Sequence, residues 1–187
     1  MSSCLVASRS SDSRSPPSLR ALFYFSPNTA DSGYDSRMGR AERAAVHIGA
    51  LNWHAVRLYR LSRRLWLSDH HALALLVEAA NRVLTGVEIP PTAEFGDGLV
   101  IMHGQGIVVH PLTRAGRDCV LYQQVTIGSR SVHGAPPTLG DGVMLFPGAR
   151  VLGDITLGNG AIIGANAVVV SDVKPSSVVT VEAATCR

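Results

Sequence analysis

The sequence is poor in charge, in aromatic residues and in lysine. Charged residues make up 17% and aromatic residues 5% of the 187 positions, and Lys174 is the single lysine among 17 basic residues. Such a composition, with 18 glycines, is untypical of coiled coils, and an apolar share of 46% argues against global disorder. A formal net charge of +3 is too small to predict nucleic-acid binding without a clustered basic patch.

Cysteines and long apolar runs are also scarce. Cys4, Cys119 and Cys186 lie far apart, which favours neither a disulfide framework nor a zinc ribbon. No apolar run reaches the ~18 residues that a transmembrane helix needs, and residues 1–14 lack the apolar core of a secretory signal. We therefore expect a reducing, cytoplasmic setting.

Residues 1–38 are predicted to be a disordered leader. They contain 11 serines and no apolar periodicity, so they bury too little apolar surface to offset their ordering entropy. Two other interpretations stay open. In the first, translation begins at Met38. In the second, the stretch is a transit peptide, although the acidic residues Asp12, Asp31 and Asp35 argue against it.

Residues 39–86 follow a helical pattern and are predicted to form a two-helix cap. We expect a break with a new N-cap at Ser68 and Asp69, then a more apolar helix from about residue 71 to 84, ended by Gly86. One face of the first helix carries small and apolar residues at helical spacing: Leu51, Ala55, Leu58, Ser62 and Leu65.

Residues 87–175 repeat with a period of six, which predicts a parallel β-helix of about five triangular coils with the apolar residue of each hexad inward. A small or branched residue often stands two positions earlier and packs beside it. The apolar residues are Ile89, Phe95, Ile101, Ile107, Ala115, Leu121, Ile127, Leu139, Leu145, Val151, Leu157, Ile163 and Val169.

The period is interrupted twice, by an eight-residue step from Ile107 to Ala115 and a twelve-residue step from Ile127 to Leu139. Solenoids place insertions as loops on one face, so we expect the second step to form an extruded loop. The alternative, a β-sandwich with accidental spacing, is disfavoured by the unbroken repeats from Leu139 to Val169.

Three segments, residues 85–111, 121–129 and 137–173, resemble the β-helix core of the serine acetyltransferases, which related sugar and polysaccharide O-acetyltransferases share. The resemblance spans roughly residues 50–175. It implies a mainly β fold, a left-handed parallel β-helix preceded by two α-helices, with residues 176–187 as a tail. It further implies transfer of acetyl from acetyl-CoA to a hydroxyl, without a metal, at sites between subunits of a homotrimer or of paired trimers.

The resemblance implies that His103, in the His-Gly motif, is the general base. A hydroxyl has a high pKa and must lose its proton as it attacks a thioester, and a neutral imidazole accepts that proton near pH 7. Glu88 precedes it at the position where the family has a carboxylate that orients the histidine. Because the separation of the two residues is close to the length of one coil, they are expected to stack on adjacent turns.

The acceptor side departs from the serine-acetyltransferase pattern. Met102 replaces the family's Asp, which can bind the serine ammonium, and the extruded loop ends in Ala-Pro-Pro instead of Arg-His-Pro. Gln105, Tyr122 and His133 are the remaining candidates for acceptor contacts. This altered set favours a sugar or polysaccharide hydroxyl over L-serine, and both acceptors stay open.

The resemblance also places acetyl-CoA contacts, although several motif positions differ. Pro147 and Gly148 stand in the family's Gly-Ala-Gly stretch, Ile162 replaces a frequent lysine, and residues 180–183 replace a terminal Gly-x-Pro-Ala. The full set of expected coenzyme contacts is Gly128, Ser129, Pro147, Gly148, Arg150 and Lys174, the last two as partners of phosphates.

Three other hypotheses remain. In the first, the chain is an inactive β-helix scaffold, which would agree with Met102 and the altered tail. It is a zinc enzyme like the γ-class carbonic anhydrases, with His103, His110 and His133 as ligands, although no close histidine pair exists. Third, the basic helix around Trp53, Tyr59 and Trp66 lies on a membrane, although packing against the β-helix or another subunit is favoured. We expect His110 to cap a corner.

Overall fold

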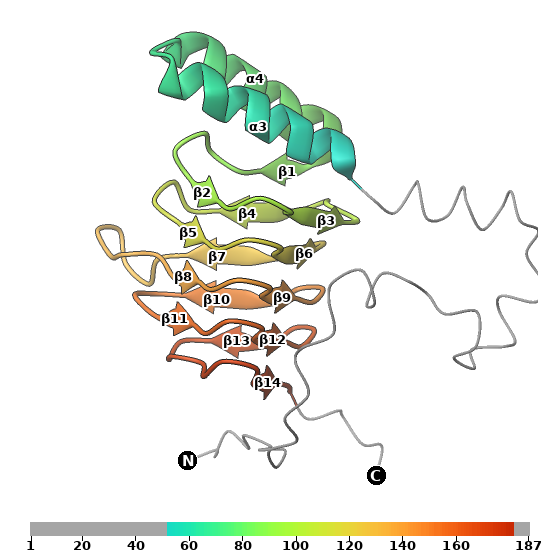
Figure 1. Ribbon diagram of the computed structural model, residues 1–187, viewed down its shortest axis with the longest axis vertical. Helices are drawn as coiled ribbons and strands as arrows, with labels where there is room; N and C mark the ends of the chain where they lie inside the picture. The colour runs from blue at the N-terminus through green and yellow to red at the C-terminus, as the bar shows by residue number, and fades with distance from the viewer. Residues whose placement is uncertain (1–51, 182–187) are drawn as a thin grey trace, which may run out of the picture.

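The computed structural model describes residues 52–181 and shows a two-helix cap stacked on one end of a β-solenoid (Figure 1). The predicted disordered leader 1–38, residues 39–51 of the predicted cap and residues 182–187 of the tail lie outside the described residues. Within 52–181, no helix is long and apolar enough to cross a membrane.

The cap consists of α3 (Trp53–Leu67) and α4 (His71–Thr85). The predicted break at Ser68–Asp69 is confirmed, but His70, not Asp69, is the N-cap of α4, and its side chain makes no capping bond. Gly86 ends α4 in the left-handed conformation, with φ 73°, as predicted for a residue without a Cβ.

The cap is fastened to the first coil by polar contacts from α3. The buried Tyr59 hydroxyl donates to the Ala93 carbonyl at 2.7 Å and accepts from the Phe95 N–H at 3.2 Å. Arg60 donates to the Phe95 and Gly96 carbonyls, and Arg63 donates to the Ala93 carbonyl at 3.0 Å. These bonds satisfy the backbone at the open end of the solenoid, which would otherwise be an unpaired edge.

The solenoid is built from parallel strand pairs in three sheets, which we name by their first strand: the β1 sheet (β1-β4-β7-β10-β13), the β2 sheet (β2-β5-β8-β11) and the β3 sheet (β3-β6-β9-β12-β14). The strands are β1 (Val87–Glu88), β2 (Glu94–Phe95), β3 (Val100–Met102), β4 (Ile107–Val109), β5 (Arg114–Ala115), β6 (Val120–Tyr122), β7 (Thr126–Gly128), β8 (Thr138–Leu139), β9 (Met144–Leu145), β10 (Arg150–Leu152), β11 (Thr156–Leu157), β12 (Ile162–Ile163), β13 (Val168–Val169) and β14 (Val178–Val179).

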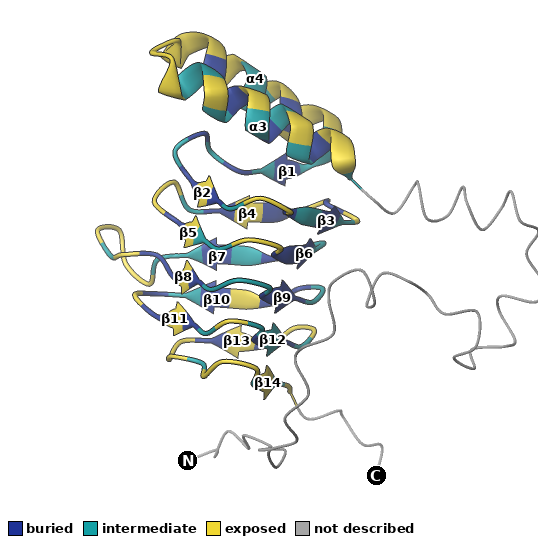
Figure 2. Cartoon of the chain, in the orientation of Figure 1, coloured by how far each residue is buried: buried dark blue, intermediate teal, exposed yellow. Residues whose placement is uncertain are grey.

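The core confirms the six-residue repeat. The inward apolar residues predicted from the period are buried except Ala115, which is half-buried, and one continuous cluster runs from the cap to the last coils. Figure 2 shows this buried interior, with exposed positions on the outside of the coils. The predicted small residues, such as Ala93, Cys119 and Ala161, are buried beside them.

The position of the first interruption differs from the prediction. Val87 pairs with Ile107, and Val109 pairs with Ile127, so Val109 rather than Ile107 continues the row of Ile127. The eight-residue step therefore lies between Ile101 and Val109. Ile107 occupies the position two residues earlier, which also points inward, and this is why the sequence alone placed it in the wrong row.

The second interruption forms the predicted loop. Ile127 pairs with Val151, and Val151 pairs with Val169, so the coil that begins at Ile127 is longer than the coil that follows it. The extra residues leave the solenoid between β7 and β8 and project from its side (Figure 1). We call the edge where the chain passes from the β1 sheet to the β2 sheet the loop corner.

Candidate active site

His103 lies in the longest turn of its corner, where the chain passes from the β3 sheet to the β1 sheet. Met102 pairs with Tyr122, and Val108 pairs with Thr126. Five residues, 103–107, therefore connect these positions here, where the next coil uses only the three residues 123–125. His103 is exposed and has a φ of 52°, in the left-handed region that non-glycine residues rarely occupy. Such strained positions concentrate at functional sites.

The His103 turn is held in place by the cap above it. The Asn52 N–H, at the start of α3, donates to the Ile101 carbonyl at 2.9 Å. Gly104 is buried, and a Cβ at this position would lie 2.5 Å from Val87 Cγ2 and 2.6 Å from Asn52 Nδ2. Only glycine therefore lets the turn pass this close to β1 and α3.

Backbone bonds along the corner also hold the turn. The Gly106 N–H donates to the Gly86 carbonyl at 2.9 Å, and the Gln124 N–H donates to the Gln105 carbonyl at 2.9 Å. Left-handed residues mark this corner at every coil: Gly86, Gly106, Gln124, Gly148 and Asn166. We call this column the His103 corner. His103 is an additional left-handed residue, in the segment that makes its turn longer.

Glu88 stands at the start of the coil that ends at the His103 turn. Its side chain points away from the core of the solenoid. Its Oε2 atom lies 3.7 Å from Nη1 of Arg82 in α4. The strand that follows the His103 turn, β4, pairs with β1, which places the turn beside the start of β1. Glu88 itself pairs with Val108, five residues after His103, so the two residues are not stacked on successive coils as expected.

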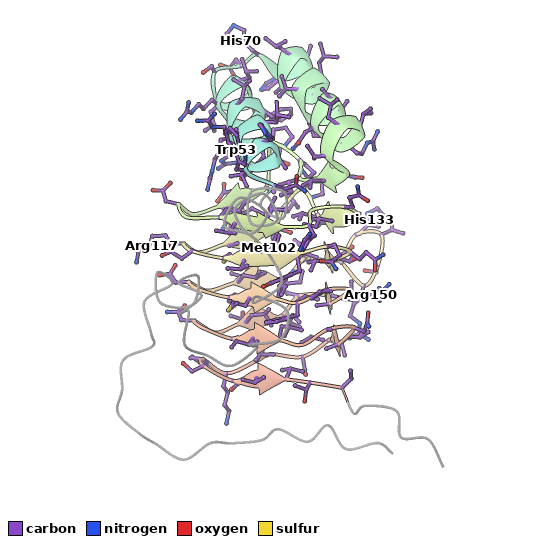
Figure 3. All side chains as sticks on the ribbon, turned by 90° about the vertical axis from the view of Figure 1, so that its right-hand side faces the viewer. Trp53, His70, Met102, Arg117, His133 and Arg150 are labelled. Atoms are coloured by element: carbon purple, nitrogen blue, oxygen red, sulfur yellow. The ribbon has the colours of Figure 1, made fainter. Side chains whose placement is uncertain are left out.

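Met102 and Tyr122 share one uncharged outer face. They are paired in register on the β3 sheet, and the Tyr122 ring stacks on Phe146 with centroids 5.1 Å apart and planes 11° apart. Met102 faces the viewer on this sheet in Figure 3. The outward positions of the described β3-sheet strands carry no charge: Val100, Met102, Val120, Tyr122, Met144, Ile162 and Val178.

His133 and His110 lie at the loop corner, not at the His103 corner. His133 is exposed on the extruded loop between β7 and β8. The His110 Nδ1 accepts the Leu112 N–H at 3.2 Å, so this imidazole closes its own turn, as expected. In the part of the chain that the structure describes, no three His, Cys, Asp or Glu side chains are grouped to bind a metal, so the three histidines do not form a zinc site.

The expected coenzyme contacts occupy three corners. Pro147, Gly148 and Arg150 lie together at the His103 corner, two coils beyond His103, where Arg150 Nη1 reaches the Gly148 carbonyl at 3.4 Å. Gly128 and Ser129 begin the extruded loop at the loop corner. Lys174 follows Val173, which bridges to Leu157 of the β2 sheet, so it belongs to the third corner and lies apart from Arg150.

Two contributions to this region were not predicted from the sequence. Asn52 anchors the His103 turn through its backbone, which leaves no signal in residue types. The stacking of Phe146 on Tyr122 could have been found, because each residue directly follows an inward leucine, Leu145 and Leu121, that the repeat places one above the other.

Known proteins share this architecture and much of this sequence. Residues 136–171 match the family model "Bacterial transferase hexapeptide (six repeats)". A serine acetyltransferase from Helicobacter pylori is 40% identical over 126 residues, covering 66% of this chain and 74% of that protein. The serine acetyltransferase of Mycobacterium tuberculosis is 42% identical over 128 residues, covering 67% of this chain and 56% of that protein.

The chain belongs to the serine acetyltransferase family. The crystal structure of Neisseria gonorrhoeae serine acetyltransferase superposes with a TM-score of 0.65 at 37% identity, covering 69% of this chain and 51% of that one. A serine acetyltransferase in complex with CoA gives a TM-score of 0.63 at 35% identity, covering 67% and 52%. This chain therefore spans only about half the length of several family members that it matches.

The two departures from the family pattern noted in the sequence lie at different corners of the solenoid. Met102 stands on the uncharged outer face directly before His103. The loop that ends in Arg-His-Pro in the family pattern ends here in Ala135, which is exposed, and in the buried Pro136 and Pro137. Neither Met102 nor the end of the loop carries a charged side chain.

Proposed function

We propose that this chain is an acetyl-CoA-dependent O-acetyltransferase in which His103 is the general base. The observation that carries the proposal is the extended His103 turn, which holds an exposed imidazole in a strained conformation and is fastened on both sides. Family membership supports it, because the relatives are named serine acetyltransferases and one is described in complex with CoA.

In the proposed reaction, the acceptor oxygen attacks the acetyl carbonyl carbon while its proton passes to the His103 imidazole. The new C–O bond forms, the C–S bond breaks, and the leaving thiolate takes the proton back. Glu88 is proposed to orient the imidazole and to stabilise its protonated form. To do so, the Glu88 carboxylate exchanges its contact with Arg82, which is weak because both side chains are partly exposed to solvent.

The acceptor is proposed to be a hydroxyl compound without an ammonium group. L-serine is the substrate that the relatives' names imply, but Met102 offers no carboxylate to a cation. Tyr122 and Gln105 offer hydrogen bonds to the hydroxyls of a sugar, and apolar neighbours suit the C–H face of a sugar ring. A sugar or polysaccharide acceptor therefore fits this uncharged surface better than a zwitterion does.

We further propose that the chain works as a homotrimer with sites between subunits. The uncharged outer face of the β3 sheet supports this, because it contrasts with the β2 sheet, where Glu94 and Arg114 form an exposed ion pair with N–O distance 3.6 Å. An apolar sheet face beside the proposed site is suited to cover by a neighbouring subunit. A monomeric mass in sedimentation at micromolar concentration would contradict the assembly.

The deciding experiment supplies labelled acetyl-CoA with L-serine and with a set of glycans and follows the labelled product. Acetylated glycan without acetylserine supports the proposal in full. Acetylserine as the main product keeps the enzyme class and rejects the acceptor. No transfer to any acceptor, with acetyl-CoA left intact, favours the inactive scaffold instead.

A further inference from the structure

We propose that the outer side of α3 binds the carboxylates of an acidic polysaccharide acceptor, an inference that rests on the proposed acetyl transfer at His103. Trp53, Arg57, Arg60 and Arg64 follow one another at intervals of four, three and four residues. In an α-helix these positions fall within an arc of roughly 60° and extend roughly 16 Å along the axis. We call this row the arginine stripe.

The arginine stripe lies on the side of α3 that faces away from α4. Ser62, on the other side of α3, is buried, and its hydroxyl donates to the Ala74 carbonyl of α4 at 2.8 Å. Arg57 and Arg64 are exposed, and Arg60 is half-buried. The contacts between the two helices therefore fix the stripe on the outside of the cap.

The charge of the stripe is not neutralised within the described part of the chain. The helix α3 contains four arginines and no acidic residue. Arg63, which is not in the stripe, has a carboxylate partner, because its Nη2 lies 3.5 Å from Glu94 Oε1. The three arginines of the stripe form no ion pair with any acid of residues 52–181. Such guanidinium groups are suited to bind the carboxylates of a ligand, each through paired hydrogen bonds.

Two of the guanidinium groups are held in place by uncharged partners. The Arg57 guanidinium lies 4.6 Å from the centre of the Trp53 ring, and Arg60 Nη1 donates to the Phe95 carbonyl at 2.6 Å. These contacts orient the two groups without removing their charge. A ligand that binds here therefore loses less free energy to the ordering of these side chains.

The stripe begins at the candidate active site. Asn52, directly before Trp53, donates its N–H to the Ile101 carbonyl at 2.9 Å, two residues before His103. Figure 3 shows Trp53 on the cap above Met102. A polysaccharide with one hydroxyl beside the His103 imidazole can therefore continue along α3 with its neighbouring sugars.

An acidic polysaccharide fits this position better than the coenzyme or a small acid does. The expected coenzyme contacts Gly148 and Arg150 lie two coils from His103 in the direction away from the cap, whereas the stripe lies on the cap side. The arginines from Arg57 to Arg64 form a row roughly 10 Å long. Such a row matches a ligand that repeats its negative charge, as a polymer of uronic acids does, and a single hydroxy acid would occupy only part of it.

The test is titration calorimetry of the full-length chain, without acetyl-CoA, with polygalacturonate and with the same polymer after reduction of its carboxyl groups to alcohols. We expect binding of the acidic polymer only, and weaker binding as salt is added. Arg57→Gln with Arg64→Gln should lower the affinity about tenfold, because two exposed ion pairs are lost. Arg64→Gln alone, which leaves the contact between Arg57 and Trp53 in place, should lower it about threefold.

Arg114→Gln with Arg117→Gln is the matched control, because it removes the same charge from exposed arginines in and directly after β5, away from α3. It should bind as the unchanged chain does. Unchanged affinity of both stripe variants overturns the proposal, as does absence of binding or equal binding of the reduced polymer. Tighter binding of poly-L-glutamate would assign the stripe to an acidic protein segment, and a lower oligomer mass of the stripe variants would assign it to a subunit contact.

The same titrations separate this inference from the proposed reaction. Binding of polygalacturonate through the stripe, without acetyl transfer to any acceptor, keeps the polysaccharide site and rejects the reaction. Acetyl transfer to a neutral glycan, without binding of polygalacturonate, keeps the reaction and rejects the site.

Discussion

The amide N–H of Gly106 donates a 2.9 Å hydrogen bond to the carbonyl oxygen of Gly86. Gly86 ends α4, and Gly106 lies three residues after His103 in the same turn. The helical cap and the candidate base are therefore joined by backbone, and the Asn52 bond to Ile101 adds a second connection. The cap positions the site and also closes the end of the solenoid.

The first prediction concerns this junction. Gly104→Ala places a methyl group within 2.6 Å of Val87 Cγ2 and Asn52 Nδ2, so the turn, β1 or α3 must move. We expect a loss of about 1–3 kcal/mol in the free energy of unfolding and a fall in turnover. Denaturant unfolding and an acetyl-transfer assay measure the two effects.

Gly128→Ala is the control for stability, because a Cβ there would lie 3.5 Å from Leu152 Cδ2, an ordinary contact. It should change the free energy of unfolding by less than about 0.5 kcal/mol. Equal stability of the two alanine variants would show that the packing around Gly104 is not as close as described.

The second prediction concerns His103 as the base. His103→Ala should lower turnover by about 10²–10⁴-fold, because the acceptor proton loses its destination. The dissociation constant of acetyl-CoA should stay the same, since the imidazole is proposed to handle the acceptor. Glu88→Gln should cost less, because the imidazole remains present.

His70→Ala is the matched histidine control and should keep turnover near that of the unchanged chain, because His70 is exposed at the start of α4, away from the His103 turn. If His103→Ala keeps its rate and His133→Ala loses it, the base has been assigned to the wrong residue.

Much of this fold was predictable because inward residues repeat every six positions, as from Leu139 to Val169. The row to which Ile107 belongs was not predictable, because each hexad has two inward positions and an isoleucine suits either one. The same ambiguity hid the extra length of the His103 turn. Counting residues along the sequence also could not show that His133 and His103 lie at different corners, since this follows only from the order of the strands in the sheets.

The third prediction concerns acceptor choice. Met102→Asp puts a carboxylate on the outer face directly before His103, where an ammonium group would find a partner. We expect turnover with L-serine to rise and turnover with a neutral glycan to fall. Met102→Leu, which keeps the position apolar, should change neither preference. Identical serine turnover in the Asp and Leu variants would mean that position 102 does not set the acceptor.

The last prediction uses the buried Cys119 thiol. Burial raises the pKa of Cys119 to about 11 from an ordinary value of 9.0. The folded state therefore holds this proton more tightly than the unfolded state, so the stability linked to it is complete below pH 9 and is lost as the pH rises through about 11. Between pH 8 and pH 10.5, the free energy of unfolding should fall more steeply in the unchanged chain than in Cys119→Ala. Tyr59, whose pKa burial also raises, contributes equally to both chains and does not obscure the comparison. Parallel pH profiles for the two chains would show that the thiol is not shielded from water, and rapid alkylation of Cys119 at pH 8, located by peptide mapping, would show the same independently.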